Sequence, residues 1–502
     1  MLLIYPPNAK ACEPPPGIAS LAASLEAHGV PCRLLDANLE GQLWLLGQPQ
    51  SATDTWSRRA FKGQARNLAT LRAIDAYRSP DRYRRAVSDL NRLLAISGSE
   101  NGVALSLADY QDLSRSPLRS GDLIAAAHDH EQNPFFCYFS QRLPALLADV
   151  AAVGFSLNYL SQALSTFAMV GYIRKQYPTL KIVLGGGLVT SWMHSPGWSS
   201  PFGELVDHLV SGPGEGPLLK FLGVVVEQKN HTLPDYSSLP LGDYFSPGLI
   251  LPYSAGSGCY WNRCSFCPER SEGNSYCPVP TSQVLSDLKL LCEQTGPILI
   301  HLLDNAISPA LLHALADNPP GTPWYGFARI DENLADPAFC HALKRSGCVM
   351  LKLGLESGDQ SVLDRMCKGI NLATASQVLN NLRDAGIAVY CYLLFGTPGE
   401  TVVEARRTLE FAVCHQDAIS FLNLAVFNMP LYGEEALEYG NKLFYEGDLS
   451  LYTAFNHPGE WDRKQVRRFL EHEFKRHPVI AAIVRRDPPQ FSSNHAPLLC
   501  RT

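Results

Sequence analysis

Short apolar runs alternate with helical stretches through the second half of the chain, and this alternation restricts the fold more than any other feature. The runs that we interpret as strands are 298–303, 324–329, 350–355, 388–395 and 420–427. Each is followed by a stretch with helical spacing, and strands joined through helices lie parallel in one sheet. Repeated βα units of this length predict a full or partial parallel (β/α) barrel over residues 251–430.

A second α/β pattern opens the chain. Its predicted strands are 2–5, 33–36, 151–156, 181–184 and 207–210. Turns follow these runs, which predicts an open, doubly wound sheet with a ligand site at the carboxyl ends of its strands. We place this domain at residues 1–226, with a helical insertion at about 41–148 where the strand pattern stops. Residues 227–250 have the composition of a linker, and 431–502 are predicted to be a polar, helical C-terminal region.

Composition excludes several classes of protein. The 502 residues are 46% hydrophobic and 18% charged, which is typical of a globular chain and excludes wholesale disorder. The net charge of −6 leaves no overall basic field, so nucleic acid is not an expected partner. No apolar run approaches the length of a membrane-spanning helix, and the first residues do not resemble a signal peptide. We therefore expect a cytoplasmic protein without a membrane segment.

Cysteine is more frequent than such a protein needs, with 14 in the chain. Disulfides rarely persist in the cytoplasm, so these residues either pack as small apolar side chains or bind metal. Cys259, Cys264 and Cys267 follow one another with the spacing C-x4-C-x2-C, on a loop that follows a short apolar stretch. Three thiolates on one loop suit an iron–sulfur cluster or another soft metal. Zinc and simple packing are the alternatives. Structural zinc takes four ligands, and no fourth ligand is obvious nearby, because the next cysteine, Cys277, lies ten residues further on.

The segment from Gly258 to Cys267 resembles the cluster loop of radical S-adenosylmethionine (SAM) enzymes. In that family three cysteines hold a 4Fe–4S cluster, and the fourth iron binds the amino and carboxylate groups of SAM. The commonest family spacing is C-x3-C-x2-C, so this chain has one extra residue in the first gap. The resemblance implies that Cys259, Cys264 and Cys267 hold the cluster within a TIM-type radical SAM barrel, and that an external donor such as flavodoxin or ferredoxin supplies the electron.

Further positions match the SAM site of the family. They are Phe266, Asp304, Arg329, Glu356, Gly396 and Pro398. In the resemblance Phe266 contacts the adenine through its backbone, Glu356 accepts hydrogen bonds from the ribose, and Arg329 pairs with the SAM carboxylate. Each also has a plain structural interpretation, such as a Glu356–Arg329 ion pair or an ordinary turn after Gly396. Their common place at predicted strand ends favours the functional interpretation.

The N-terminal sheet resembles the Rossmann or flavodoxin-like cobalamin domain of the cobalamin-dependent radical SAM class. The positions that this resemblance assigns to cobalamin are Pro7, Ser156, Gly185, Gly186, Gly187, Gly214 and Glu215. Small residues at strand ends let a bulky ligand approach the backbone. The D-x-H-x-x-G motif of the classical cobalamin domain is absent, and the His128-Asp129-His130 segment lacks its spacing. A doubly wound domain that has lost its cofactor is the alternative.

The resemblance implies a cobalamin-dependent radical SAM methyltransferase acting on a substrate carbon. Reductive cleavage of SAM would give a 5′-deoxyadenosyl radical that abstracts a substrate hydrogen, and methylcobalamin would then deliver the methyl group. The alternatives are a non-methylating rearrangement or cyclisation, a methylthiotransferase-like activity and a non-catalytic zinc-binding protein. Cys391 is a weak candidate for a further catalytic residue. The substrate itself is not identified by any residue pattern.

Overall fold

The computed structural model describes residues 1–49, 54–195, 197–225, 231–440, 442–443, 447–488 and 495–500. These residues form two compact units. The first consists of Met1–Ile250 with residues 447–450, and the second of most of the chain from Leu251 onward. Among the described residues, no helix is both long and apolar enough to cross a membrane.

A parallel sheet of five strands forms the centre of the first unit in the part of the chain that the structure describes. The strands are β1 (Leu2–Tyr5), β2 (Arg33–Asp36), β5 (Ala152–Ser156), β6 (Lys181–Gly185) and β7 (His208–Leu209), in the spatial order β2-β1-β5-β6-β7. This is the flavodoxin-like order, and the direction of winding changes between β1 and β5. Ligands of such sheets bind outside the strand ends at that point.

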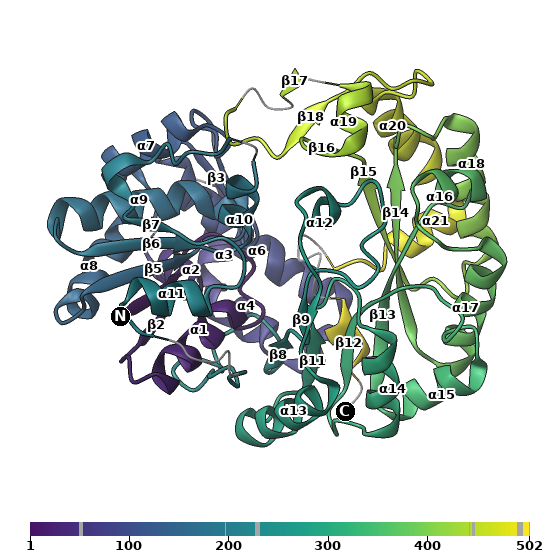
Figure 1. Ribbon diagram of the computed structural model, residues 1–502, viewed down its shortest axis with the longest axis horizontal. Helices are drawn as coiled ribbons and strands as arrows, with labels where there is room; N and C mark the ends of the chain where they lie inside the picture. Colours follow the sequence, from purple (N-terminus) through teal and green to yellow (C-terminus); the bar gives the residue numbers. More distant parts are fainter. Residues whose placement is uncertain are drawn as a thin grey trace. The chain divides into compact units, whose positions relative to one another are not determined.

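The helices around this sheet begin and end at residues that favour helix termini. They are α1 (Pro16–Ala27), α2 (Ala37–Gly47), α9 (Leu160–Gln176), α10 (Gly187–Met193) and α11 (Glu215–Phe221). Pro16 starts α1, and Gly29 ends it with a φ of 74° while its N–H donates to Glu26. α9 is buried over most of its length and lies beside the sheet (Figure 1). The predicted doubly wound core is present.

The inserted region is only partly helical. It begins after α2, later than predicted, and contains α3 (Thr55–Lys62), α4 (Gln64–Leu71), α5 (Ile74–Tyr77), α6 (Pro80–Ser99), α7 (Ser120–His128) and α8 (Phe136–Leu147). Between α6 and α7 lies an antiparallel hairpin of β3 (Val103–Leu105) and β4 (Tyr110–Asp112). Buried Asp89 accepts hydrogen bonds from Trp56, Arg59 and Asn67, which ties α3 and α4 to α6. Three-residue strands carry too little periodicity to be recognised from sequence.

The described part of the expected linker, residues 231–250, packs on the first unit. Phe245 donates its backbone N–H to Ala11, and the Tyr244 hydroxyl donates to Asp36 at the end of β2 over 2.8 Å. Burial raises the pKa of Asp36 to about 6, an effect that hydrogen bonds from Leu39 and Tyr244 oppose. These buried contacts agree with the division of the chain into compact units, which places the segment in the first unit.

The second unit is built on a parallel sheet that runs in chain order. Within the described residues its strands are β8 (Ile250–Tyr253), β11 (Leu299–Leu302), β12 (Trp324–Ala328), β13 (Cys348–Glu356), β14 (Ala388–Phe395) and β15 (Phe421–Val426). Every predicted strand is present to within a few residues. The sheet has six strands and does not close on itself, so it corresponds to the partial form of the predicted barrel.

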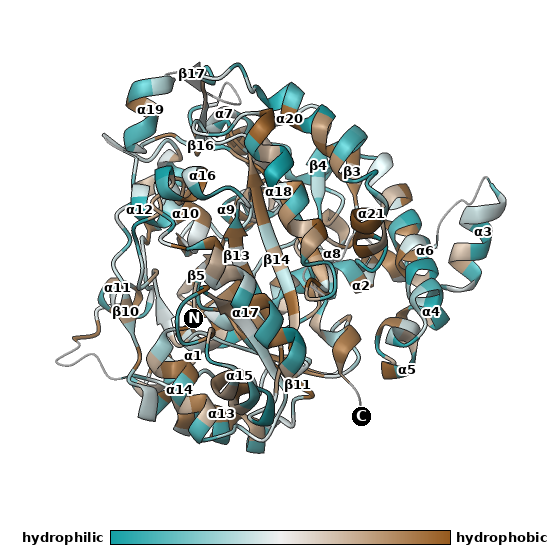
Figure 2. Cartoon of the chain, turned by 90° about the vertical axis from the view of Figure 1, so that its right-hand side faces the viewer, coloured by the Kyte–Doolittle hydropathy of each residue, from teal (hydrophilic) through white to brown (hydrophobic). Residues whose placement is uncertain are grey.

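Helices separate these strands along the chain. They are α13 (Thr281–Thr295), α14 (Pro309–Asp317), α15 (Pro337–Arg345), α16 (Gln360–Arg365), α17 (Leu372–Ala385) and α18 (Val402–Cys414). Hydrophobic and hydrophilic residues alternate along α17 and α18, as expected for helices with one face on a sheet (Figure 2). On the other face of the sheet the His495 ring packs on Tyr390 with centroids 4.2 Å apart.

The C-terminal region is not wholly helical, contrary to the prediction. An antiparallel sheet contains β16 (Met429–Pro430), β17 (Lys442–Leu443) and β18 (Tyr452–Ala454), with α19 (Glu434–Tyr439) between the first two. Helices α20 (Arg463–Phe469) and α21 (Pro478–Val484) follow. Residues 447–450 belong to the first unit, where Leu449 donates to Leu118 and Asp448 accepts from Ser120. The strands of this sheet are two or three residues long and show too little alternation to have been predicted.

Candidate active site

Four of the predicted SAM residues lie at one edge of the second sheet. Asp304 follows β11, Arg329 follows β12, Glu356 ends β13 and Gly396 follows β14. The carboxyl ends of parallel strands share one edge, and the cysteine loop follows β8 at the same edge. The structure therefore brings the predicted residues and the cysteine loop to the position where barrel active sites lie.

A short hairpin holds the start of the cysteine loop. β9 (Gly256–Ser257) pairs antiparallel with β10 (Cys277–Pro278), with Ser257 opposite Cys277. Gly258 has a φ of 73°, and a Cβ placed there would lie 2.5 Å from the Ser275 carbonyl oxygen. Only glycine fits this conformation and this close approach, so the loop must leave the hairpin at Gly258.

The three thiols of the loop differ in burial. Cys264 is buried, whereas Cys259 and Cys267 are half-buried. Burial raises the pKa of Cys264, and the positive charges of Lys368 and Arg329 oppose the rise. Burial also raises the pKa of Cys267 to about 11, opposed by the backbone N–H groups of α12 (Pro268–Ser271). Among the described residues no group of three His, Cys, Asp or Glu side chains is arranged to hold a metal ion, so the assignment of the three thiols as cluster ligands stays a prediction.

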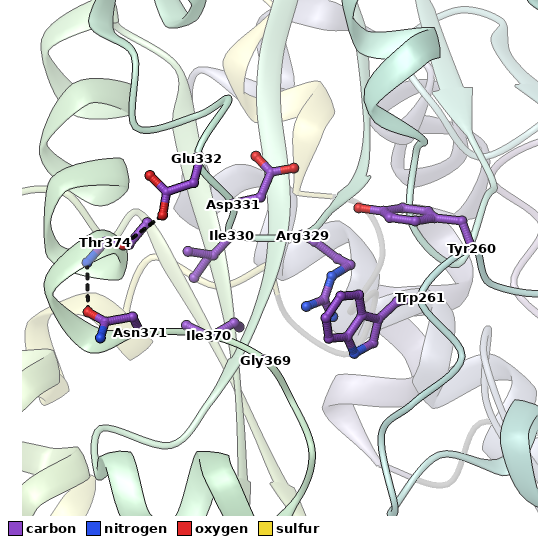
Figure 3. A pocket seen from close by; sticks show the side chains of 10 residues that line it. All are labelled: Tyr260, Trp261, Arg329, Ile330, Asp331, Glu332, Gly369, Ile370, Asn371 and Thr374. Carbon is purple, nitrogen blue, oxygen red and sulfur yellow. Dashed lines mark hydrogen bonds between the residues drawn. The ribbon is translucent and has the colours of Figure 1, made fainter.

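Trp261 lies in the first cysteine gap, next to a turn at Asn262, and packs against Arg329. Asn262 has a φ of 43°, and the Arg329 guanidinium lies 3.9 Å from the Trp261 ring centroid (Figure 3). Arg263 stacks on the same indole at 4.9 Å. Tyr260, Trp261 and Arg329 help to line a pocket of about 250 Å³. Cation–π stacking orders this part of the loop, and it occupies the guanidinium that we expected to bind the SAM carboxylate.

The segment Met366–Gly369 contacts the cysteine loop through its backbone. Ser265 donates its N–H to the Met366 carbonyl over 3.0 Å, and the Trp261 indole N–H donates to the Cys367 carbonyl over 3.4 Å. Arg329 donates to the Lys368 carbonyl over 2.7 Å. These bonds attach the loop to the chain that follows β13.

Replacing Gly369 by alanine should loosen the cysteine loop. Gly369 has a φ of 65°, and an added Cβ would lie 2.2 Å from Trp261, so the indole must leave its place beside Arg329. We expect a loss of about 2 kcal/mol in the free energy of unfolding and faster hydrogen exchange at residues 259–267. Gly296 is the matched control, because its φ is 57° and nothing lies within 4 Å of an added Cβ. Equal loop exchange in the two alanine variants would refute the importance of this contact.

Glu356 adopts an unusual backbone conformation at the end of β13. Its φ is 68°, and the register of β13 with β14 shifts between Gly354 and Glu356. The Glu356 carboxylate accepts a hydrogen bond from Lys368 Nζ over 2.8 Å. Left-handed backbone at a residue with a side chain is costly and clusters at functional sites. The Glu356–Arg329 ion pair, which was the plain alternative to a SAM-binding role, is not formed, and Glu356 pairs with Lys368 instead.

The turn after β14 is held by Glu400 and by the C-terminal region. The buried Glu400 carboxylate accepts hydrogen bonds from the Gly396 N–H over 2.5 Å and the Trp461 indole N–H over 3.0 Å. His457 hydrogen-bonds the Thr397 carbonyl over 2.7 Å. Burial raises the pKa of Glu400 to about 7, opposed by those two hydrogen bonds. The turn that carries Gly396 and Pro398 is thereby fixed from both ends.

Glu400 should make stability depend on pH. A carboxyl group whose pKa rises from 4.5 to about 7 on folding binds its proton more tightly in the folded state. Its contribution is complete below about pH 4.5 and is lost as the pH rises through about 7, a change of about 3 kcal/mol. We expect Glu400→Gln to flatten the fall in unfolding free energy between pH 5 and pH 8, measured by urea denaturation. Parallel pH profiles for the two proteins would contradict this assignment.

The other predicted SAM residues lie in defined surroundings. Asp304 accepts a hydrogen bond from the Ala255 N–H over 3.1 Å, and burial raises its pKa to about 6, opposed by that bond. Phe266 packs against the cluster of Phe427, Met429 and Ala436. Pro398 helps to line a second pocket, of about 480 Å³, with Gly399 and residues of α19. Their roles toward SAM stay predictions.

Cys391 does not face the barrel interior. The rings of Tyr390 and Tyr392 lie 4.7 Å apart on one face of β14, where Tyr390 contacts His495. Cys391 lies between them in sequence, so strand alternation turns it to the opposite face, in register with Leu353. It is fully buried, and burial raises the pKa of its thiol. The structure supports a packing role for this cysteine.

The cobalamin candidates gather at the carboxyl edge of the first sheet. Ser156 ends β5 and Gly185 ends β6, while Gly186 and Gly187 lead into α10. Asn158 bridges the two strand ends, since its amide donates to Ser156 over 3.0 Å and its carbonyl oxygen accepts from the Gly187 N–H over 2.9 Å. Gly214 and Glu215 start α11, and Pro7 follows β1.

Several site residues were not predicted from the sequence. They are Trp261, Lys368, Gly369, His457 and Trp461, with Asn158 in the first unit. Trp261 lies inside the cysteine motif, and the longer first gap could have drawn attention to it. Lys368 and Trp461 act through contacts across the fold, for which the sequence holds no signal.

The sequence matches the Radical SAM superfamily over residues 328–412. The matched stretch runs from the end of β12 into α18, and so includes Arg329, Glu356 and Gly396 but not the cysteine loop. It is 29% identical over 202 residues to bacteriochlorophyllide d C-12(1)-methyltransferase of Chlorobaculum tepidum, covering 38% of this chain and 43% of that protein. It is 25% identical over 188 residues to an uncharacterized methyltransferase of Pyrococcus horikoshii, covering 36% and 40%. The chain matches about two fifths of the length of these curated relatives.

Solved structures show the same fold. The radical SAM methyltransferase TsrM from Kitasatospora setae, with cobalamin and a 4Fe–4S cluster bound, superposes with a TM-score of 0.52 at 15% identity over 92% of this chain and 84% of its own. The cobalamin-dependent SAM radical enzyme OxsB, with aqua-cobalamin bound, gives 0.51 at 16% identity over 64% and 58%. The chain thus shares its fold with these two proteins, with TsrM over most of its length.

The residues at both sites suit the groups that this architecture implies. Cys259, Cys264 and Cys267 supply three soft thiol donors on one loop, which fits an iron–sulfur cluster. At the first sheet a Cβ on Gly187 would meet only Asn158, at 3.7 Å, so the backbone there is open to a ligand. The donor set and this glycine turn both fit the predicted cofactors.

Proposed function

We propose that this chain is a cobalamin-dependent radical SAM enzyme that transfers a methyl group to a carbon atom of its substrate. The observation that carries the proposal is the convergence of the cysteine loop, Asp304, Glu356 and the Gly396 turn on one edge of the second sheet. The resemblance of both sheets to cobalamin-dependent radical SAM proteins and the two methyltransferase relatives support it.

The residues have separate tasks in this proposal. Cys259, Cys264 and Cys267 hold the 4Fe–4S cluster, Glu356 orients the ribose of SAM, and the Gly396 turn borders the adenine. The glycine turn Gly185–Gly187 lets cobalamin approach the backbone of the first sheet. When bound, these cofactors supply reductive cleavage of SAM and methyl transfer, with the electron coming from a flavodoxin or ferredoxin.

The proposal is tested by anaerobic reconstitution with iron, sulfide and cobalamin. We expect about four irons per chain, cobalamin that survives gel filtration, and SAM cleavage on reduction with dithionite. Cleavage without retained cobalamin would indicate a radical SAM enzyme of another class. Stoichiometric zinc without iron would refute the proposal altogether.

The product distinguishes methylation from the second candidate, a non-methylating rearrangement or cyclisation. OxsB is a cobalamin-dependent SAM radical enzyme that, unlike TsrM, is not named as a methyltransferase, which keeps this candidate open. A mass increase of one methylene unit in the product, labelled when the methyl group of SAM is labelled, supports methylation.

A further inference from the structure

Lys368 lies at the junction of the cysteine loop and the end of β13. Its ammonium nitrogen is 2.8 Å from a Glu356 carboxylate oxygen and 5.4 Å from the centre of the Phe266 ring. The two charged side chains are only 10% and 12% exposed. Lys368 and Glu356 therefore form a buried ion pair, and removal of one member of such a pair is strongly destabilising.

The sheet leaves room for this pair only because residue 354 is glycine. A Cβ on Gly354 would lie 2.6 Å from the Glu356 carboxylate oxygen and 2.8 Å from Lys368 Nζ. Gly354 is in register with Tyr392 of β14, on the face that also carries the Phe327 ring. The ammonium group therefore lies directly over the backbone at the carboxyl end of the sheet, where the SAM site is proposed.

Backbone strain is concentrated around the same junction. Three of the non-glycine residues with positive φ in the described chain lie here. Asn262, with a φ of 43°, is in the cysteine loop. Glu356, with a φ of 68°, is a member of the ion pair, and Cys367, with a φ of 52°, directly precedes the other member. Glu460, in the C-terminal region, is the remaining one. The turn at Cys367 ends α16 and aims Lys368 back at Glu356. Strain of this kind persists where the surrounding structure fixes a functional geometry.

Lys368 both helps to hold the cysteine loop in place and brings a positive charge near it. Its carbonyl accepts a hydrogen bond from Arg329, which stacks on Trp261. Its ammonium group lies 5.4 Å from the ring centre of Phe266, the residue directly before Cys267, and so brings positive charge beside the cysteine loop. One residue therefore contacts the carboxylate expected at the ribose, the ring of Phe266 and, through Arg329, the cysteine loop.

We propose that Lys368 is a positioning residue that holds Glu356 and the cysteine loop in one arrangement and brings positive charge to the cluster and SAM site. This inference rests on the proposed function for its cofactors, but the packing of the loop against Lys368 does not depend on them. A positive charge beside an iron–sulfur cluster stabilises its reduced form and raises its reduction potential.

The test is Lys368→Met, which keeps the length of the side chain and removes its charge. In the chain without cofactors we expect faster hydrogen exchange at residues 259–267 and at Glu356. In the reconstituted protein we expect full iron content, a lower midpoint potential in an EPR-monitored titration, and roughly tenfold weaker SAM binding. Lys368→Arg should restore the potential in part, because it keeps the charge.

Lys344→Met is the control, since Lys344 is exposed on α15 and its ammonium group contacts the Gly386 carbonyl. Loop exchange and midpoint potential equal to the wild-type values in Lys368→Met would overturn the inference, even if the wild-type protein binds its cluster and cleaves SAM. Failure of the wild-type chain to take up iron would instead refute the proposed function, while the exchange experiment would still test the contact.

Discussion

Cys264→Ala is expected to reduce the iron bound after anaerobic reconstitution from about four atoms per chain to below one, and to abolish SAM cleavage. Cys264 is the buried member of the triad, so no solvent ligand can replace its thiol. Two remaining thiols, one at each end of the loop, cannot hold a cluster that needs three. Iron analysis and the EPR signal of the reduced protein measure the loss.

The cysteine controls separate ligand loss from general damage. Cys391→Ala removes a buried thiol within β14, and Cys414→Ala removes an exposed one at the end of α18. Both should keep full iron content, although the buried variant should lose about 1 kcal/mol of stability. A Cys264→Ala protein that still binds about four irons and cleaves SAM would show that other residues hold the cluster.

Gly186→Ala should destabilise the first unit by about 3 kcal/mol and abolish cobalamin retention. Gly186 has a φ of 105°, and an added Cβ would lie 2.4 Å from the Leu157 carbonyl oxygen. The turn between β6 and α10 must therefore move away from β5. Hydrogen exchange in these elements and gel filtration with cobalamin measure the two effects.

Gly187→Ala tests cobalamin binding without the loss of stability expected for Gly186→Ala. Its added Cβ would meet only Asn158, at 3.7 Å, so we expect less than about 0.5 kcal/mol of destabilisation. Weaker cobalamin retention with unchanged stability would show that the ligand lies along this turn. Full retention in Gly187→Ala would place cobalamin away from the turn, or exclude it from the first sheet.

The strongly periodic elements of both sheets could be predicted because their residues alternate between strand and helix patterns. Runs such as 388–395 and 420–427 are apolar over a strand length and bounded by turns, so even their ends were close to those of β14 and β15. The hairpin of β3 and β4 and the strands β16 to β18 were missed. They contain two or three residues each, and they are strands because their backbones pair with a neighbouring strand, not because their side chains alternate.

The spacing of Cys259, Cys264 and Cys267 and the residues at strand ends are local properties of the chain, so they were sufficient to predict which residues make up the candidate site and which chemistry they suit. How those residues are held follows from tertiary contacts. The tertiary structure stacks Arg329 on Trp261, pairs Glu356 with Lys368 and turns Cys391 away from the interior. Such contacts join residues as far apart as 261 and 329, and they depend on packing and on the direction of each side chain, which spacing along the chain does not encode.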